Sequence, residues 1–139
     1  MATFNKFDSF VEALAEKVHN LGSDVLKVML TNSAPVASNT QKSQLTEIGA
    51  ASGYPAGGSQ ATLVSSAQTS GTYKLTLNDV TYTAGAAIGP FQYAVLYNDT
   101  ATNKELIGWW AYTSSISLAI GESFVIDMDA ANGVLTIGP

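Results

Sequence analysis

The sequence feature that most constrains this fold is a close succession of short β-type segments after residue 60, each ended by turn residues. In the segment 91–97, aromatic and β-branched side chains stand at every second position, which is the period of a strand. Pairs such as Asn98-Asp99 punctuate the series with residues suited to turns. Many short strands at this spacing predict an all-β fold, an antiparallel sandwich or barrel. The expected strands are 24–31, 61–67, 72–77, 80–83, 91–97, 105–112, 115–120, 123–127 and 133–137.

One helix is expected before the strands, over residues 7–21, because apolar side chains recur there at spacings of three and four. Ser9 and Glu12 stand at capping-box spacing, and Gly22 is placed to end the helix. A short amphipathic helix needs a partner to be stable, so its apolar stripe must pack on its own sheet or on a neighbouring subunit. The stripe consists of Phe7, Phe10, Val11, Leu14, Val18 and Leu21.

The first expected strand, 24–31, is followed by a long segment of different character. The strand has its apolar residues mainly at even positions, so one face should be buried. Residues 32–60 contain few large apolar side chains and form a long loop or arm. Loops of that length are usually functional or disordered. The segment 53–58 is either a turn that leads into the next strand or an ordered arm that contacts a neighbouring subunit. The candidate contact residues of this arm are Tyr54, Pro55, Gly57 and Gly58.

The side chains on which enzyme chemistry depends are scarce. The chain has no cysteine, no arginine and one histidine, and only 12% of its residues are charged. Catalytic sites gather perturbed acids, bases or metal ligands, so we expect neither an enzyme nor a bound cofactor. Six lysines against eleven acids give a net charge of −5, and the scattered lysines argue against nucleic-acid binding. We expect one domain, 1–139, synthesised in the cytoplasm without a signal peptide or a membrane-spanning segment.

Two polar features have structural interpretations. His19 is expected near the end of the helix, away from its apolar stripe, where the helix dipole favours the charged imidazolium. The segment 127–133 offers oxygen ligands like those of a calcium loop, but its fifth position is Ala131, which cannot bind a cation. A tight hairpin with its turn at Asn132-Gly133 accounts for the same residues better.

The pair Trp109-Trp110 is the best candidate for a binding site. Neighbouring side chains of a strand face opposite sides, so one tryptophan should enter the core and the other should face outward. An outward tryptophan could anchor a protein interface or form a platform for a sugar ring. The alternative is a second covered face, beneath the helix or a loop, and the sequence leaves both interpretations open.

Several segments together resemble small structural proteins of tailed bacteriophages. They are the opening amphipathic helix, DVLKVMLTN at 24–32, TEIGAASGYPAGG at 46–58, and FQYAVLYNDT with LIGWW between residues 91 and 110. In kind, the chain is similar to head decoration or cement proteins, in particular the jelly-roll cement proteins of short-tailed phages such as the Bordetella phage.

This resemblance implies a jelly-roll-like β-sandwich with an N-terminal helix in residues 1–22. It implies a homodimer or higher homo-oligomer on the capsid exterior of the virion. There it would bind the phage major capsid protein and stabilise contacts between capsomers, without cofactors or catalytic residues. Two alternatives remain: a structural subunit of the tail or fibre, and a carbohydrate- or receptor-binding module that uses the exposed tryptophan.

Overall fold

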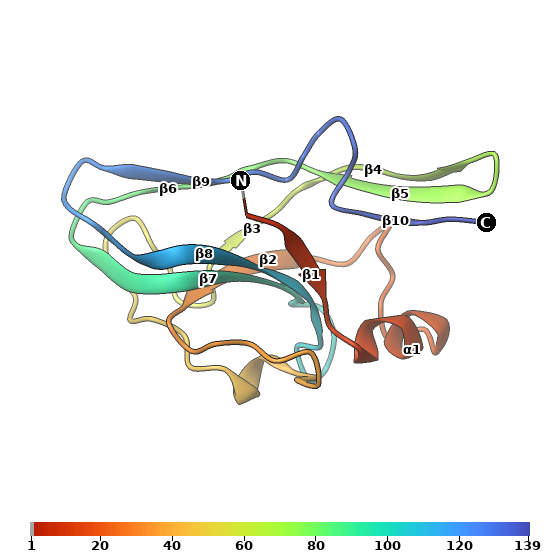
Figure 1. Ribbon diagram of the computed structural model, residues 1–139, viewed down its shortest axis with the longest axis horizontal. Helices are drawn as coiled ribbons and strands as arrows, with labels where there is room; N and C mark the ends of the chain where they lie inside the picture. Colours follow the sequence, from red (N-terminus) through yellow and green to blue (C-terminus); the bar gives the residue numbers. More distant parts are fainter. Residues whose placement is uncertain (1) are drawn as a thin grey trace.

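The computed structural model describes residues 2–139 and consists mostly of antiparallel β-structure. Figure 1 shows two layers of strands, with the α-helix beside one end. A 3₁₀ turn, Lys42–Gln44, lies in the long segment 32–60. The elements are β1 (Phe4–Lys6), α1 (Ser9–Ala15), β2 (Leu26–Thr31), β3 (Ser59–Gln60), β4 (Leu63–Thr69), β5 (Thr72–Leu77), β6 (Val80–Thr83), β7 (Ile88–Asn98), β8 (Leu106–Leu118), β9 (Ser123–Ile126) and β10 (Leu135–Ile137).

The lower layer of Figure 1 is a five-stranded sheet in the order β1-β8-β7-β2-β3. The upper layer contains a three-stranded sheet, β10-β5-β4, and a two-stranded sheet, β6-β9. The expected strands 105–112 and 115–120 form one long strand, β8, whose register with β7 is interrupted. The expected hairpin at 127–133 is wrong, because β9 pairs with β6 whereas β10 pairs with β5.

The main core lies between the two layers and follows the two-residue period of the strands. In β7, the buried Ala94 and Leu96 belong to this core, together with Trp110 of β8. The intervening Val95 and Tyr97 point to the other side of the sheet. Burying one large apolar side chain contributes roughly 1.5–3 kcal/mol, so this alternation supplies most of the driving force for the fold.

The second face of the five-stranded sheet is also covered. A second buried cluster lies there and includes Met29 of β2. Leu45 contributes from the segment 32–60, and Phe7 contributes from the connection between β1 and α1. The expected buried face of strand 24–31 is confirmed, since Leu26, Val28 and Leu30 lie in the main core. Its other face is buried as well, because the long segment folds back over it. The cluster consists of Phe7, Met29, Leu45, Val95, Tyr97 and Leu106, with Trp109 packed against it.

The helix α1 is shorter than the expected 7–21. Asp8 stands at its N-cap and no side chain caps its first turn, so the expected capping box of Ser9 and Glu12 does not form. The helix ends at Ala15, and Lys17 then takes a left-handed φ of +69°. The chain turns inward there instead of continuing along the helix axis.

Only part of the expected apolar stripe packs on its own subunit. Phe10 and Leu21 are buried in the main core. Val11 is 51% exposed, and Val18 is 36% exposed. The short helix therefore leaves some of its apolar surface uncovered.

Candidate functional site

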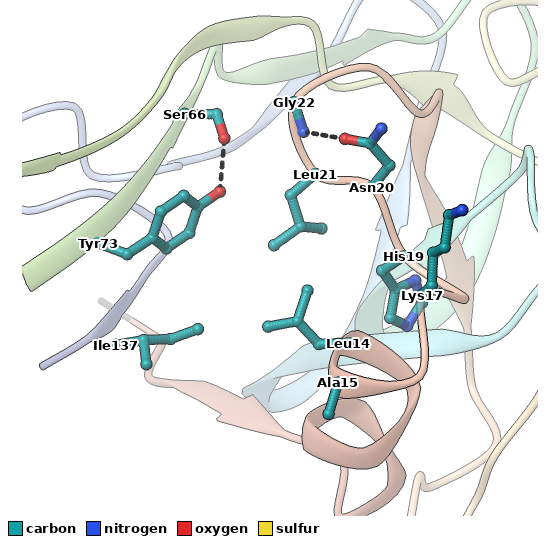
Figure 2. A pocket seen from close by; sticks show the side chains of 10 residues that line it. All are labelled: Leu14, Ala15, Lys17, His19, Asn20, Leu21, Gly22, Ser66, Tyr73 and Ile137. Atoms are coloured by element: carbon teal, nitrogen blue, oxygen red, sulfur yellow. Dashed lines mark hydrogen bonds between the residues drawn. The ribbon is translucent and has the colours of Figure 1, made fainter.

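A groove of about 440 Å³ lies between the turn after α1 and the sheet β10-β5-β4 (Figure 2). Leu14 and Leu21 point into it from one wall, and Tyr73 and Ile137 face them from the sheet. A neighbouring hollow of about 400 Å³ shares Leu14 and Ile137 and extends to Val11. Its walls can accept apolar side chains. The groove of Figure 2 is lined by Leu14, Ala15, Lys17, His19, Asn20, Leu21, Gly22, Ser66, Tyr73 and Ile137.

His19 stands at the edge of this groove with its ring buried, 4% exposed. The Oδ1 atom of Asn98 accepts the backbone N–H groups of Thr100 and Ala101 at 3.0 and 3.1 Å. Its Nδ2 atom therefore donates, to His19 Nδ1 at 3.0 Å and to Asp24 Oδ2 at 2.7 Å. Because Nδ1 is an acceptor, the neutral imidazole carries its proton on Nε2.

The expected imidazolium at a helix end is not supported. Burial lowers the pKa of His19 below its usual value, and the nearby carboxylates of Glu105 and Asp24 oppose that shift only in part. The helix ends four residues earlier, at Ala15, so the helix dipole does not act on this ring. His19 is a neutral, structural side chain that fixes the turn after α1.

Tyr54 is part of the subunit's own core, with an exposed fraction of 0%. Its hydroxyl accepts the backbone N–H of Leu30 at 3.0 Å and donates to Glu47 Oε2 at 2.6 Å. Burial and the hydrogen bond to Glu47 raise its pKa far above the usual value, so it stays protonated. The expectation that Tyr54 contacts a neighbouring subunit is therefore wrong, because its ring is inaccessible.

Glu47 ties the rest of the long segment to this ring. The same Oε2 atom accepts the N–H of Gly57 at 2.6 Å, and Oε1 pairs with Lys42 Nζ at 3.1 Å. Tyr97 donates to the carbonyl of Gly57 at 2.6 Å. The sequence offers no signal for this role of Glu47, since a single acid in a polar segment is typical of a side chain exposed to water.

The other residues of the arm differ in their surroundings. Gly58 is buried with a φ of +80°, and an added Cβ would collide with the carbonyl of Val28. A glycine is therefore required there by both backbone conformation and space. Pro55 is exposed at the tip of the turn and Gly57 is half-buried. Of the four candidate contact residues in the arm, Pro55 is the one that stands fully at the surface.

Neither tryptophan forms an open platform. Trp110 is 4% exposed in the main core, where its ring lies 5.0 Å from that of Phe4. Trp109 points to the opposite face, as the strand period requires, but it is half-buried. The ring of Phe7 lies 4.5 Å from it at 44°. Of the two interpretations of this pair, the structure therefore favours a covered second face. Trp109 presents no open ring on which a sugar could stack.

The carboxylates of 127–133 are used within the loop. Asp127 Oδ1 accepts the N–H of Asp129 at 2.7 Å, and Asp129 Oδ1 accepts the N–H of Asn132 at 3.1 Å. Hydrogen bonds from the Asn132 side chain and backbone lower the pKa of Asp129. Within residues 2–139, no three His, Cys, Asp or Glu side chains come together as a metal site would require.

No protein-family model, curated protein or solved structure matches this chain. Across residues 2–139, no helix has the length and apolar character needed to cross a bilayer. The described residues offer an apolar groove beside α1 and exposed strand surface as candidate contact surfaces.

Replacing Tyr54 with Phe should lower the free energy of unfolding by roughly 1–3 kcal/mol, because a buried N–H at Leu30 loses its acceptor. Denaturant unfolding measures this change. Tyr93→Phe is the matched control, since the Tyr93 hydroxyl makes no side-chain hydrogen bond within residues 2–139. Equal losses in the two variants would contradict the role given to the Tyr54 hydroxyl.

Acidification should destabilise the protein through His19. Its folded-state pKa lies below the unfolded value of about 6.5, so the unfolded chain takes up the proton first as the pH falls. The free energy of unfolding should therefore decrease as the pH drops through and below that value. His19→Gln, which keeps an acceptor for Asn98, should flatten this dependence. Thermal unfolding across neutral to mildly acidic pH tests it; identical slopes for both proteins would contradict it.

Proposed function

We propose that this protein is a structural component of a bacteriophage virion, a jelly-roll-like β-sandwich that binds the outside of the head as a cement protein. Its partner is the phage major capsid protein, and its role is to stabilise the contacts between capsomers. The resemblance of the sequence to such proteins motivates the proposal. The groove beside α1 is the structural observation that carries it.

An interaction protein needs a stable body and an apolar surface that the body leaves open. The groove and its extension toward α1 expose Val11 by 51% and Ile137 by 41%. Exposed apolar surface gathered in one place is typical of a protein–protein contact. Lys17 is the charged residue among those that line the groove of Figure 2, since His19 is neutral, and no carboxylate lines it. Low charge is typical of interface centres.

A protein with this structure would also suit a subunit of the tail or fibre. The number of copies per virion distinguishes these roles from that of a cement protein. Quantitative mass spectrometry of purified virions should give a ratio to the major capsid protein near unity, because a cement protein follows the capsid lattice. Particles that lack the protein should also break at a lower temperature. A few copies per virion would contradict the cement role and favour the tail.

The groove should be the surface that contacts the capsid. Val11→Asp places a charge at the edge of the groove. It should weaken binding to particles that lack this protein by roughly tenfold or more, because the new carboxylate must lose its hydration shell when the contact forms. Val125→Asp is the matched control, since Val125 is also 51% exposed but lies on β9. Co-sedimentation with particles measures both affinities. Wild-type binding by Val11→Asp, or an equal loss in Val125→Asp, would contradict this assignment.

A further inference from the structure

The strand β4 is an open edge of the sheet β10-β5-β4. Its neighbour on one side is β5, and within residues 2–139 no strand pairs with its other side. Six of its seven residues are exposed, and Ser66 is half-buried. The strand carries neither a charged residue nor a proline. Its one protecting feature is an irregular register between Leu63 and Ser65, so the stretch from Ser65 to Thr69 is open to pairing with another chain.

The other edges are shorter or interrupted. The edge strands β1, β3 and β10 contain three, two and three residues, and β1 carries Lys6. The strands of the two-stranded sheet have four residues each. The part of β8 beyond β1 has an irregular register with β7 between Ala111 and Ile116. Strand β4 is the longest edge whose register is regular over most of its length, from Ser65 to Thr69.

The hairpin turn fixes which backbone groups of β4 point away from β5. Ser70 and Gly71 form its two-residue loop, with φ values of +52° and +84°, as in a type I′ turn. Thr69 and Thr72 are then a hydrogen-bonded pair, and such pairs alternate along an antiparallel ladder. The N–H and C=O groups of Ser66 and Gln68 therefore point outward, ready for a further strand.

The chemistry of this sheet favours a second copy of the chain as that strand. The chain has a net charge of −5, but the sheet β10-β5-β4 contains one charged residue, Lys74, and no acid. Two such edges can approach without the repulsion that the rest of the surface would cause. A two-fold axis at Ser66 would place Ser65 of one copy opposite Ala67 of the other. These small side chains permit close pairing.

We propose that two copies associate through antiparallel pairing of their β4 strands around a two-fold axis, which joins two three-stranded sheets into one six-stranded sheet. The interface is isologous, so each copy contributes the same backbone groups. This pairing uses the outward backbone edge of β4, whereas the groove beside α1 meets this strand at the Ser66 side chain. It is a property of the isolated protein, and it stands whether or not the chain is a cement protein.

Light scattering after gel filtration tests the pairing across a dilution series. The wild-type protein should show twice the 14.5 kDa mass of the chain and should dissociate on dilution. Ser65→Glu with Ala67→Glu places acids directly opposite acids across the axis and should weaken association by roughly tenfold or more. Within one copy, Ala67 lies opposite Lys74, so the second acid does not disturb the hairpin.

Thr81→Glu with Ile120→Glu is the control, because it adds the same charge at exposed positions outside this sheet. Ser66→Pro is a second variant, which removes an outward N–H group without removing a bond to β5; its thermal unfolding shows whether it folds. Loss of the dimer in the β4 variants alone supports the proposal. A wild-type monomer at every concentration, or a dimer that persists in Ser65→Glu with Ala67→Glu, would overturn it.

Discussion

The hydrogen bond between Tyr54 and Glu47 is the interaction on which the covered second face of the large sheet depends. It holds the segment 32–60 against β2, since the Tyr54 hydroxyl also accepts the N–H of Leu30, and the N–H of Ile48 adds a bond to the Leu30 carbonyl. With that segment in place, Leu45 reaches the cluster around Met29 and Tyr97. Without it, one face of the five-stranded sheet would meet water, and its apolar residues would be exposed. A polar contact thus determines where apolar surface can be buried.

The strands could be predicted from the sequence because their alternation is local. The pattern of 91–97 predicts β7, and the turn at Ser70-Gly71 separates β4 from β5 close to the expected positions. An all-β, antiparallel fold follows from such patterns alone. The length of α1 was overestimated, since the apolar period continues past Ala15 although the chain turns inward there. The spacing shows where apolar side chains recur along the chain. It does not show whether they all belong to one helix.

The site was harder to predict, because its residues meet only in three dimensions. The alternation of Trp109 and Trp110 predicted opposite faces but not that Phe7 would cover one of them. Tyr54 stands among glycines and a proline, which is typical of an exposed turn, yet its ring is buried. The groove beside α1 arises from the space between two elements that are far apart in sequence. No local pattern encodes such a space.

The burial of Asn98 has a consequence for how the protein can be produced. Asn98-Asp99-Thr100 is an acceptor sequence for N-linked glycosylation. In the folded chain this asparagine is 0% exposed, and both ends of its amide are hydrogen-bonded. A glycan attached during secretion would occupy the space of His19 and Asp24, so a modified chain could not close its turn after α1. Production in a eukaryotic secretory pathway would therefore divide the chains into unmodified, folded molecules and glycosylated ones that cannot reach this structure.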